Sequence, residues 1–123
     1  MAVLQEEPGA EQVRDIVYGH GTVLLPFLVL MECEYKLLTH QPQAAEESLL
    51  FIEAWPVEVV ESDYEWRRRA AEIKSHGRIS FADAWVAALA LLRDAELVHR
   101  DPEFDAVAGL KAVRLPYNRR SRS

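Results

Sequence analysis

Residues 80–101 read SFADAWVAALALLRDAELVHRD and contain the clearest fold signal in the chain. Ser80 followed three residues later by an acid is the pattern of a capping box, which here opens a helix over residues 81–93. That helix is apolar on nearly every side, so it is predicted to be buried. A short strand is predicted directly after it, at residues 96–99. A buried helix that leads into a strand is typical of proteins in which helices cover a parallel sheet.

The rest of the chain continues this alternation of helices and strands. Short strands separated by helices require right-handed crossovers, which place the strands parallel to one another. The sequence therefore predicts an α/β fold with a parallel sheet covered on both faces. A short helical or irregular segment is expected at residues 104–110. Further strands are predicted at residues 22–25, 56–61 and 112–115, and further helices at residues 10–20, 27–38, 43–54 and, from a capping box of Ser62 with Glu65, 62–77.

Length and composition indicate a single globular domain. The chain has 123 residues, of which 50% are hydrophobic and 28% are charged. Cys33 is the only cysteine, so neither an intramolecular disulfide nor a cysteine-based zinc cluster can form, and a reducing compartment is the simplest interpretation. The longest apolar run, residues 23–31, is far shorter than the about twenty residues that a membrane helix needs. With no visible secretory signal, a cytoplasmic protein without a membrane span is expected.

Charge is distributed unevenly along the chain. The formal net charge is -6, but the last ten residues contain four arginines and no acid, so residues 1–113 carry -10. Such an acidic body is poorly suited to bulk electrostatic binding of nucleic acid, which depends on Lys and Arg. Any handling of nucleic acid must therefore use local contacts or metal ions. Residues 117–123 are predicted to be a solvated basic tail, and the three arginines at residues 67–69 to lie on a solvated, salt-bridged helix face.

Two aspartates lie where a parallel sheet places its ligands. Ligands bind outside the carboxyl ends of the strands, and Asp101 directly follows the strand predicted at residues 96–99. Its alternative role is that of a turn residue, because Asp before Pro commonly opens a turn. Asp83 lies in the first turn of the buried helix, where it is alternatively the capping partner of Ser80. The two roles are compatible, since a carboxylate held at a helix N-terminus is also positioned to bind a metal.

A third candidate acid interrupts an apolar helix. Glu32 lies one turn into the helix predicted at residues 27–38, within a run of large hydrophobic residues. A lone acid in such a run must face solvent, a partner or an ion. Glu34 is the alternative, because helical spacing places each of the two acids beside apolar neighbours. Periodicity does not choose between them.

Four motifs in this order resemble a known family. The first is EPGAE at residues 7–11, the second LPFLVLMECEY at residues 25–35, the third ISFADAWVAALA at residues 79–90 and the fourth LVHRDPEF at residues 97–104. Together they resemble PIN domains, and more narrowly the VapC-type toxins of bacterial and archaeal toxin-antitoxin pairs. The resemblance covers about residues 2–116. It implies a three-layer α/β/α fold and a magnesium- or manganese-dependent endoribonuclease, usually dimeric and silenced by a VapB-type antitoxin.

The resemblance also implies roles for the three acids. Glu32 matches the family's helix glutamate, Asp83 its helix-start aspartate and Asp101 the aspartate after its fourth strand, so the family pattern favours Glu32 over Glu34. Two carboxylates about 5 Å apart repel by about 3 kcal/mol, so three in one pocket need a cation. Magnesium prefers oxygen ligands, and a bound divalent cation can activate water and neutralise phosphoryl charge. We therefore expect Glu32, Asp83 and Asp101 to hold one Mg²⁺ or Mn²⁺.

The start of the chain departs from the family pattern. PIN domains begin with a strand that ends in an aspartate, whereas this chain resembles the family from inside the following helix. The first strand and its aspartate, a fourth ligand, are therefore expected to be missing, which would leave a gap between strands 22–25 and 96–99. Two explanations stay open: a start placed downstream of that strand, or a truncated and catalytically weakened descendant. In the second case the chain could be a non-catalytic module that binds an antitoxin-like basic peptide.

Overall fold

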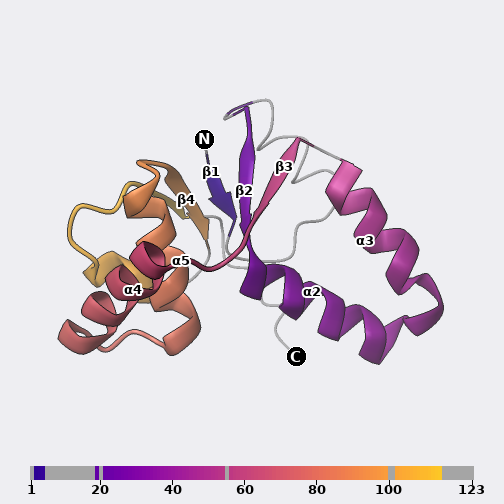
Figure 1. The fold of residues 1–123 in the computed structure, drawn as a ribbon, viewed down its shortest axis with the longest axis horizontal. Coiled ribbons are helices and arrows are strands. Elements are labelled where there is room, and N and C mark those ends of the chain that lie inside the picture. Colours follow the sequence, from indigo (N-terminus) through magenta and orange to yellow (C-terminus); the bar gives the residue numbers. More distant parts are fainter. Residues whose placement is uncertain (1, 5–18, 20, 55, 100–101, 115–123) are drawn as a thin grey trace.

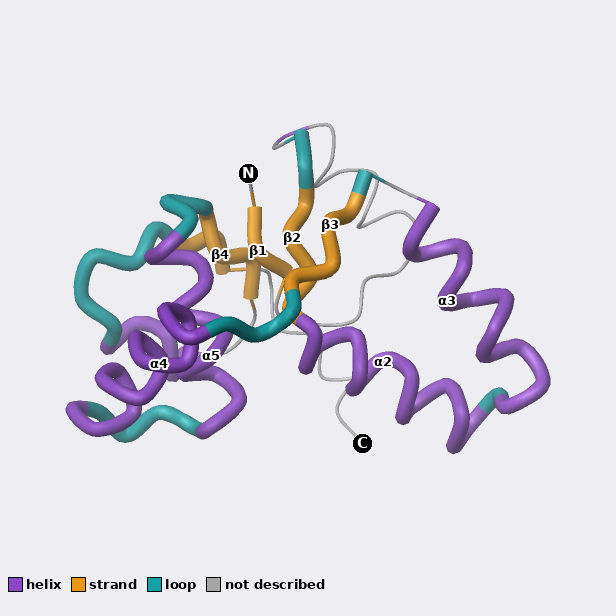
Figure 2. Tube along the Cα trace, in the orientation of Figure 1, coloured by secondary structure: helices purple, strands orange, loops and turns teal. Residues whose placement is uncertain are grey.

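The computed structural model describes residues 2–4, 19, 21–54, 56–99 and 102–114. Within them, a parallel sheet of five strands has the order β3-β2-β1-β4-β5 and is flanked by helices (Figure 1, Figure 2). The predicted α/β class with a parallel sheet is confirmed. The strands are β1 (Ala2–Leu4), β2 (Val23–Pro26), β3 (Val57–Val60), β4 (Glu96–His99) and β5 (Ala112–Arg114). The helices are α2 (Phe27–His40), α3 (Ala45–Ala54), α4 (Tyr64–His76) and α5 (Phe81–Leu92), with 3-10 turns η1 (Pro42–Ala44) and η2 (Pro102–Ala106).

The central strand corrects the expectation of a gap. Residues Ala2–Leu4 form β1, which pairs with β2 through Val3 opposite Leu24 and with β4 through Val3 opposite Leu97. Ala2 and Val3 are both 0% exposed. A central parallel strand is buried on both faces, so a short continuous apolar run suffices to form it. The prediction was wrong because it assigned these residues to the helix of the EPGAE motif.

The aspartate expected at the end of the first strand is a separate question. In the sequence, β1 is followed by Gln5, an amide where the family pattern has an acid. Gln5 lies outside the described residues, as do the helix predicted at residues 10–20 for most of its length, Asp101, and the tail at residues 117–123. The absence of this ligand therefore stays a prediction from the sequence.

The core is built on the central strands and on α5. All four residues of β2 are buried, and the helix side of the core is made of small residues such as Ala84, Ala87 and Ala88. These small side chains let α5 pack closely on β1 and β4. The predicted burial of this helix is confirmed, with seven of its twelve residues buried. Among the described residues, no helix combines the length and apolar character needed to cross a membrane.

Helix α4 begins one residue later than the sequence predicts. The N-cap is Asp63, whose carboxylate oxygen Oδ1 accepts a hydrogen bond from the backbone N–H of Trp66 at 2.8 Å. The predicted capping box of Ser62 with Glu65 is therefore wrong, because the adjacent aspartate is an equally good cap and lies in the correct register. The helix ends before Gly77, as predicted.

Other boundaries shift by small amounts. The helix predicted over residues 27–38 extends to His40. The helix predicted over residues 43–54 starts instead as the 3-10 turn η1, with Pro42 at its first position. The irregular segment expected at residues 104–110 contains the end of η2. In Figure 1, α2 and α3 form an arm that extends away from the sheet, whereas α4 and α5 lie together beside β1 and β4.

Three aromatic rings connect the helices that start near the sheet. Phe27, Trp66 and Trp85 meet edge to face, with ring centroids 5.0 to 5.6 Å apart. The indole Nε1–H of Trp66 also donates a hydrogen bond to the backbone oxygen of Trp85 at 2.7 Å. Since these residues belong to α2, α4 and α5, the cluster fixes the start of α2 relative to α5.

An exposed ion pair predicts a pH dependence of stability. Asp94 lies in the turn before β4, and its Oδ1 is 2.8 Å from Nζ of Lys111, which directly precedes β5. The hydrogen bond and the charge of Lys111 lower the pKa of Asp94 below its usual 3.8, and those of Asp94 raise the pKa of Lys111 above 10.5. The ion pair therefore stabilises the fold at pH values at which Asp94 is deprotonated and Lys111 is protonated. Its contribution is lost as the pH falls through the lowered pKa of Asp94, or rises through the raised pKa of Lys111.

We expect Lys111→Met to lower the Tm slightly at neutral pH, with the difference from the wild type shrinking below about pH 4. The difference is also expected to shrink in high salt, because both side chains are exposed to solvent. Differential scanning calorimetry from acidic to neutral pH measures it. A Tm difference that stays the same down to pH values where Asp94 is protonated would contradict this account.

Candidate active site

Two of the three candidate acids belong to helices that start at the same edge of the sheet. Helix α2 follows β2 directly, so it begins at the carboxyl end of the strands. Helix α5 leads through a short turn into β4, so it runs antiparallel to β4 and its first turn lies towards the end where β4 finishes (Figure 1). This places Glu32 and Asp83 on the side of the sheet where parallel folds bind ligands. Asp101 follows β4 by two residues in the sequence but lies outside the described residues.

Asp83 is buried at the N-terminus of α5. Its residue is only 6% exposed, and its backbone N–H donates to Oγ of the N-cap residue Ser80 at 3.1 Å. The helix dipole favours a carboxylate at this position. The predicted capping interaction with Ser80 is therefore confirmed for the backbone of Asp83.

The other half of the capping box is supplied by a different residue. In a complete box the acid at the third helical position accepts the backbone N–H of the N-cap. Here the N–H of Ser80 instead donates to Oε1 of Glu103. Glu103 thus takes the part in the cap that the box pattern assigns to the Asp83 carboxylate. The cap thus holds Asp83 through its backbone N–H.

The residues that flank Asp101 are anchored on both sides. His99, the last residue of β4, is 1% exposed, and its ring meets that of Phe104 edge to face at 4.8 Å. Phe104 is itself buried in η2, and its neighbour Glu103 is bonded to the start of α5. The chain on either side of residues 100–101 is therefore attached to β4 and to the helix that carries Asp83. The role of Glu103 was not predicted from the sequence.

Glu32 differs from Asp83 because it is exposed. Its side chain is 54% exposed and its Oε1 lies 3.1 Å from Nζ of Lys36, one helical turn further along α2. An exposed pair of this spacing is worth about 0.3–0.5 kcal/mol, so a divalent cation could replace Lys36 at little cost. The sequence prediction did not include this pair, although the spacing of four residues between the two charges was a signal for it. Glu34 is exposed as well, so burial does not distinguish the two glutamates.

The donor atoms fit a hard divalent cation. Carboxylate oxygens suit Mg²⁺ or Mn²⁺, whereas Cys33 and His99, two softer donors, are both 1% exposed and lie in the core. Among the described residues no group of three His, Cys, Asp or Glu side chains could hold a metal ion, and Asp101 is not one of those residues. The convergence of Glu32, Asp83 and Asp101 therefore stays a prediction.

Comparison with protein families identifies the class of the fold. The family model described as PIN domain matches residues 1–110, so the chain belongs to the PIN-domain family. PIN domains are generally nucleases. No match was found among proteins of curated function.

Solved structures with the same fold come from toxin-antitoxin complexes. The chain is similar to one in the DNA-bound VapBC of Salmonella typhimurium, with 16% identity, a TM-score of 0.73 and coverage of 92% of this chain and 96% of that one. It is also similar to a chain of VapBC2 from Rickettsia felis, bound to a promoter DNA fragment, with 15% identity and a TM-score of 0.72. The match covers 93% of this chain and 98% of that one. A third similar chain belongs to VapBC-5 of Mycobacterium tuberculosis, a member of the VapBC family of toxin-antitoxin systems. It has 22% identity and a TM-score of 0.65, and the match covers 93% of this chain and 98% of that one. At identities this low, the comparison shows that the chain shares the fold of these proteins.

Proposed function

We propose that this protein is a divalent-metal-dependent endoribonuclease and the toxin of a toxin-antitoxin pair. The observation that carries the proposal is the placement of Asp83. Its residue is buried at a helix N-terminus beside the carboxyl edge of a parallel sheet, and Glu103 completes the cap there. A carboxylate held at this position offers the oxygen donors that a hard divalent cation prefers. Membership of the PIN-domain family supports the same assignment.

Glu32, Asp83 and Asp101 are the residues that would hold Mg²⁺ or Mn²⁺. The bound metal would lower the pKa of a water molecule and neutralise charge on the scissile phosphate. Asp83 contributes a rigid ligand, because α5 is packed into the core and its first turn is capped. Glu32 contributes an exposed ligand whose recruitment requires the release of Lys36. The His99–Phe104 contact and the Glu103 bond hold the described residues that precede and follow Asp101 in the sequence.

The charge of the chain is compatible with this mode of RNA binding. Residues 1–113 carry a net charge of -10, so RNA cannot be attracted by the overall field of the protein. Binding must instead rely on the metal and on a few local cations. A divalent ion held by the carboxylates would be such a local cation, because Mg²⁺ bound by a few carboxylates can also take phosphate oxygens as ligands.

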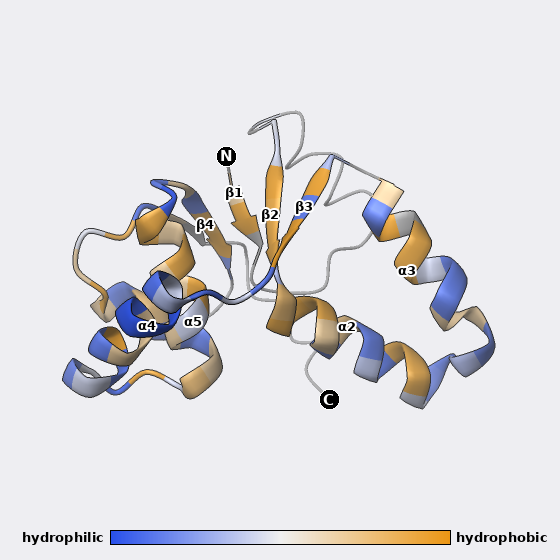
Figure 3. Ribbon diagram, viewed as in Figure 1, coloured by the Kyte–Doolittle hydropathy of each residue, from blue (hydrophilic) through white to orange (hydrophobic). Residues whose placement is uncertain are grey.

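We further propose a VapB-like antitoxin as partner, a homodimeric assembly and a cytoplasmic location. The likeness to chains of VapBC complexes supports the first of these. The α2–α3 arm, which contains hydrophobic stretches (Figure 3), supports it independently, because several of its large apolar side chains are exposed. Exposed apolar surface of this kind marks interaction sites. The side chains concerned are Met31, Tyr35, Leu38 and Leu50, each more than half exposed.

The direct test is cleavage of a structured RNA by the purified protein. We expect cleavage in millimolar Mn²⁺, none in excess chelator, and loss of cleavage in Asp101→Asn, because the amide removes a charged metal ligand. Asp105→Asn is the matched control, an exposed aspartate four residues away that is expected to retain activity. If Asp101→Asn cleaves as fast as Asp105→Asn, Asp101 is not a ligand and the proposed site is wrong.

A second candidate function is favoured by Gln5. This amide follows β1 at the point where the family pattern has an aspartate, so the chain could be a non-catalytic module that binds a basic, antitoxin-like peptide. The same preparation distinguishes the two functions. Binding of a basic peptide without any Mn²⁺-dependent cleavage supports the module, whereas cleavage that depends on Asp101 supports the nuclease.

A further inference from the structure

A pocket of about 600 Å³ lies between α4, α5 and η2, outside the proposed metal site. Its volume is within the range of about 300–1,000 Å³ that is typical of small-molecule sites. The floor is apolar and is formed by Ile73, Ile79, Leu91 and Val107, of which Ile79 is buried and the others are partly buried. The pocket can therefore cover the apolar part of a ligand.

Two arginines line the pocket together with two acids. Arg69 and Arg78 both line it, and neither guanidinium has a charged partner within the part of the chain that the structure describes. Two other arginines of α4, by contrast, contact Tyr64. Arg67 lies over the ring of Tyr64 at 5.3 Å, and Arg68 donates to the Tyr64 hydroxyl at 3.3 Å.

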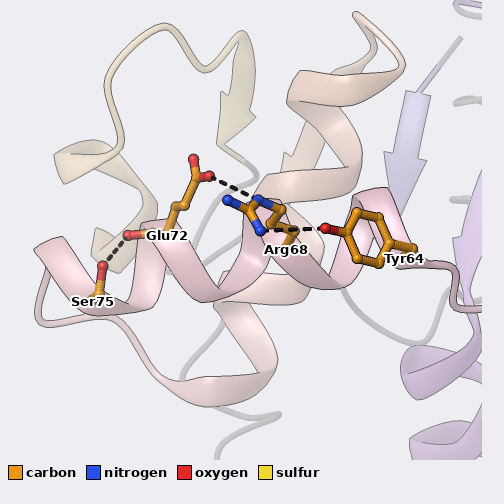
Figure 4. A network of polar contacts seen from close by, with 4 residues as sticks. All are labelled: Tyr64, Arg68, Glu72 and Ser75. Carbon is orange, nitrogen blue, oxygen red and sulfur yellow. Dashed lines mark hydrogen bonds and ion pairs between the residues drawn. The ribbon is translucent and has the colours of Figure 1, made fainter.

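The two acids that line the pocket are engaged with other groups. Figure 4 shows Glu72 turned towards Arg68, with 4.0 Å between Oε1 of Glu72 and Nε of Arg68. Glu103 accepts the backbone N–H of Ser80. Both carboxylates thus have partners other than Arg69 and Arg78. The pocket combines an apolar floor with two arginines that are available to an anion.

We propose that this pocket binds a small organic anion with an apolar body. The apolar body contacts the floor, and a carboxylate or a similar head group meets the guanidinium groups of Arg69 and Arg78, whose forked donors suit such anions. A nucleobase fits less well, because His76 is the one aromatic side chain among the described lining residues and offers a base only a single imidazole on which to stack. This site does not depend on the proposed nuclease activity.

The pocket shares one wall with the start of α5. Residues 77–79 line it, and Lys74 Nζ holds this segment through the backbone oxygen of Ile79 at 2.8 Å. The next residue, Ser80, caps the helix that carries Asp83. A ligand in the pocket therefore contacts the segment that leads into the proposed metal site, and the backbone amide of Asp83 should report its binding.

The test is a titration of the ¹⁵N-labelled full chain with octanoate, followed by NMR. We expect the amide signals of Gly77 and Gly109, which line the pocket, to shift, while those of Gly19 and Gly21, before β2, stay unchanged. The double variant Arg69→Gln/Arg78→Gln should bind octanoate roughly tenfold more weakly, since it loses two charged donors. The control Arg67→Gln/Arg93→Gln loses the same charge outside the pocket and should bind as the wild type does.

The uncharged probe 1-octanol separates the two parts of the proposal. We expect it to bind more weakly than octanoate and with similar affinity to both double variants. Equal binding of octanol and octanoate to the wild type, or equal octanoate affinity in the two double variants, would overturn the anion site. So would shifts of all four glycines, or none up to the solubility limit. Shifts that depend on protein concentration without any ligand would show that a second copy of the chain occupies the pocket, which would also overturn it.

Discussion

Asp83→Asn is expected to reduce Mn²⁺-dependent RNA cleavage by about a hundredfold or more, because the amide keeps the shape of the side chain but removes the charge that binds the metal. The substitution leaves the helix cap intact, since Ser80 accepts the backbone N–H of residue 83 and Glu103 accepts that of Ser80. A loss of activity in a folded protein would therefore report on the carboxylate.

Metal binding can be measured separately from cleavage. Saturating Mn²⁺ at a hundred times its Kd should add about 2.7 kcal/mol to the free energy of unfolding of the wild type, and Asp83→Asn should abolish this gain. The matched control is Asp63→Asn, a helix-start aspartate of α4 whose capping role an asparagine can take over. Wild-type cleavage and the full Mn²⁺ stabilisation in Asp83→Asn would remove Asp83 from the proposed site.

Trp66→Ala is expected to have the largest effect on stability, lowering the free energy of unfolding by about 3–5 kcal/mol. Trp66 is 2% exposed and contacts the rings of Phe27 and Trp85 edge to face. The alanine variant leaves a cavity at the junction of α2, α4 and α5 and also loses the hydrogen bond to the backbone oxygen of Trp85. Urea denaturation followed by circular dichroism measures the change.

Trp66→Phe serves as the control for the hydrogen bond. It keeps much of the ring packing and removes the N–H donor, so a loss of about 1–2 kcal/mol is expected. A destabilisation of Trp66→Ala below that of Trp66→Phe would contradict the central role of this ring cluster. Because Phe27 begins the helix that carries Glu32, the alanine variant should also weaken Mn²⁺ binding.

The elements with strong local signals could be predicted from the sequence. Strand β4 and helix α5 lie at their predicted positions, because an apolar helix with a cap and a short apolar strand leave few alternatives. The error at β1 has a different origin. Three apolar residues carry no periodicity, so only their pairing with β2 and β4 shows that they form a strand.

The candidate site was predictable in part. The burial of Asp83 could be inferred from the apolar helix around it, and the family pattern selected Glu32 over Glu34 although both are exposed. The bond between Glu103 and Ser80 could not be inferred, because it joins groups 23 residues apart. The same holds for the choice of Asp63 over Ser62 as N-cap, which depends on where the first turn of α4 is fixed by its packing.

The position of β1 gives three residues an influence out of proportion to their number. In the order β3-β2-β1-β4-β5, which the described residues form, they connect the β3–β2 pair to the β4–β5 pair through backbone hydrogen bonds. Cutting them away would divide the sheet into two separate ribbons facing an open slot one strand wide. A protein shortened in this way should bind a short apolar peptide in that slot. Strand β1 could therefore be removed from the chain and supplied again as a separate peptide that restores the sheet.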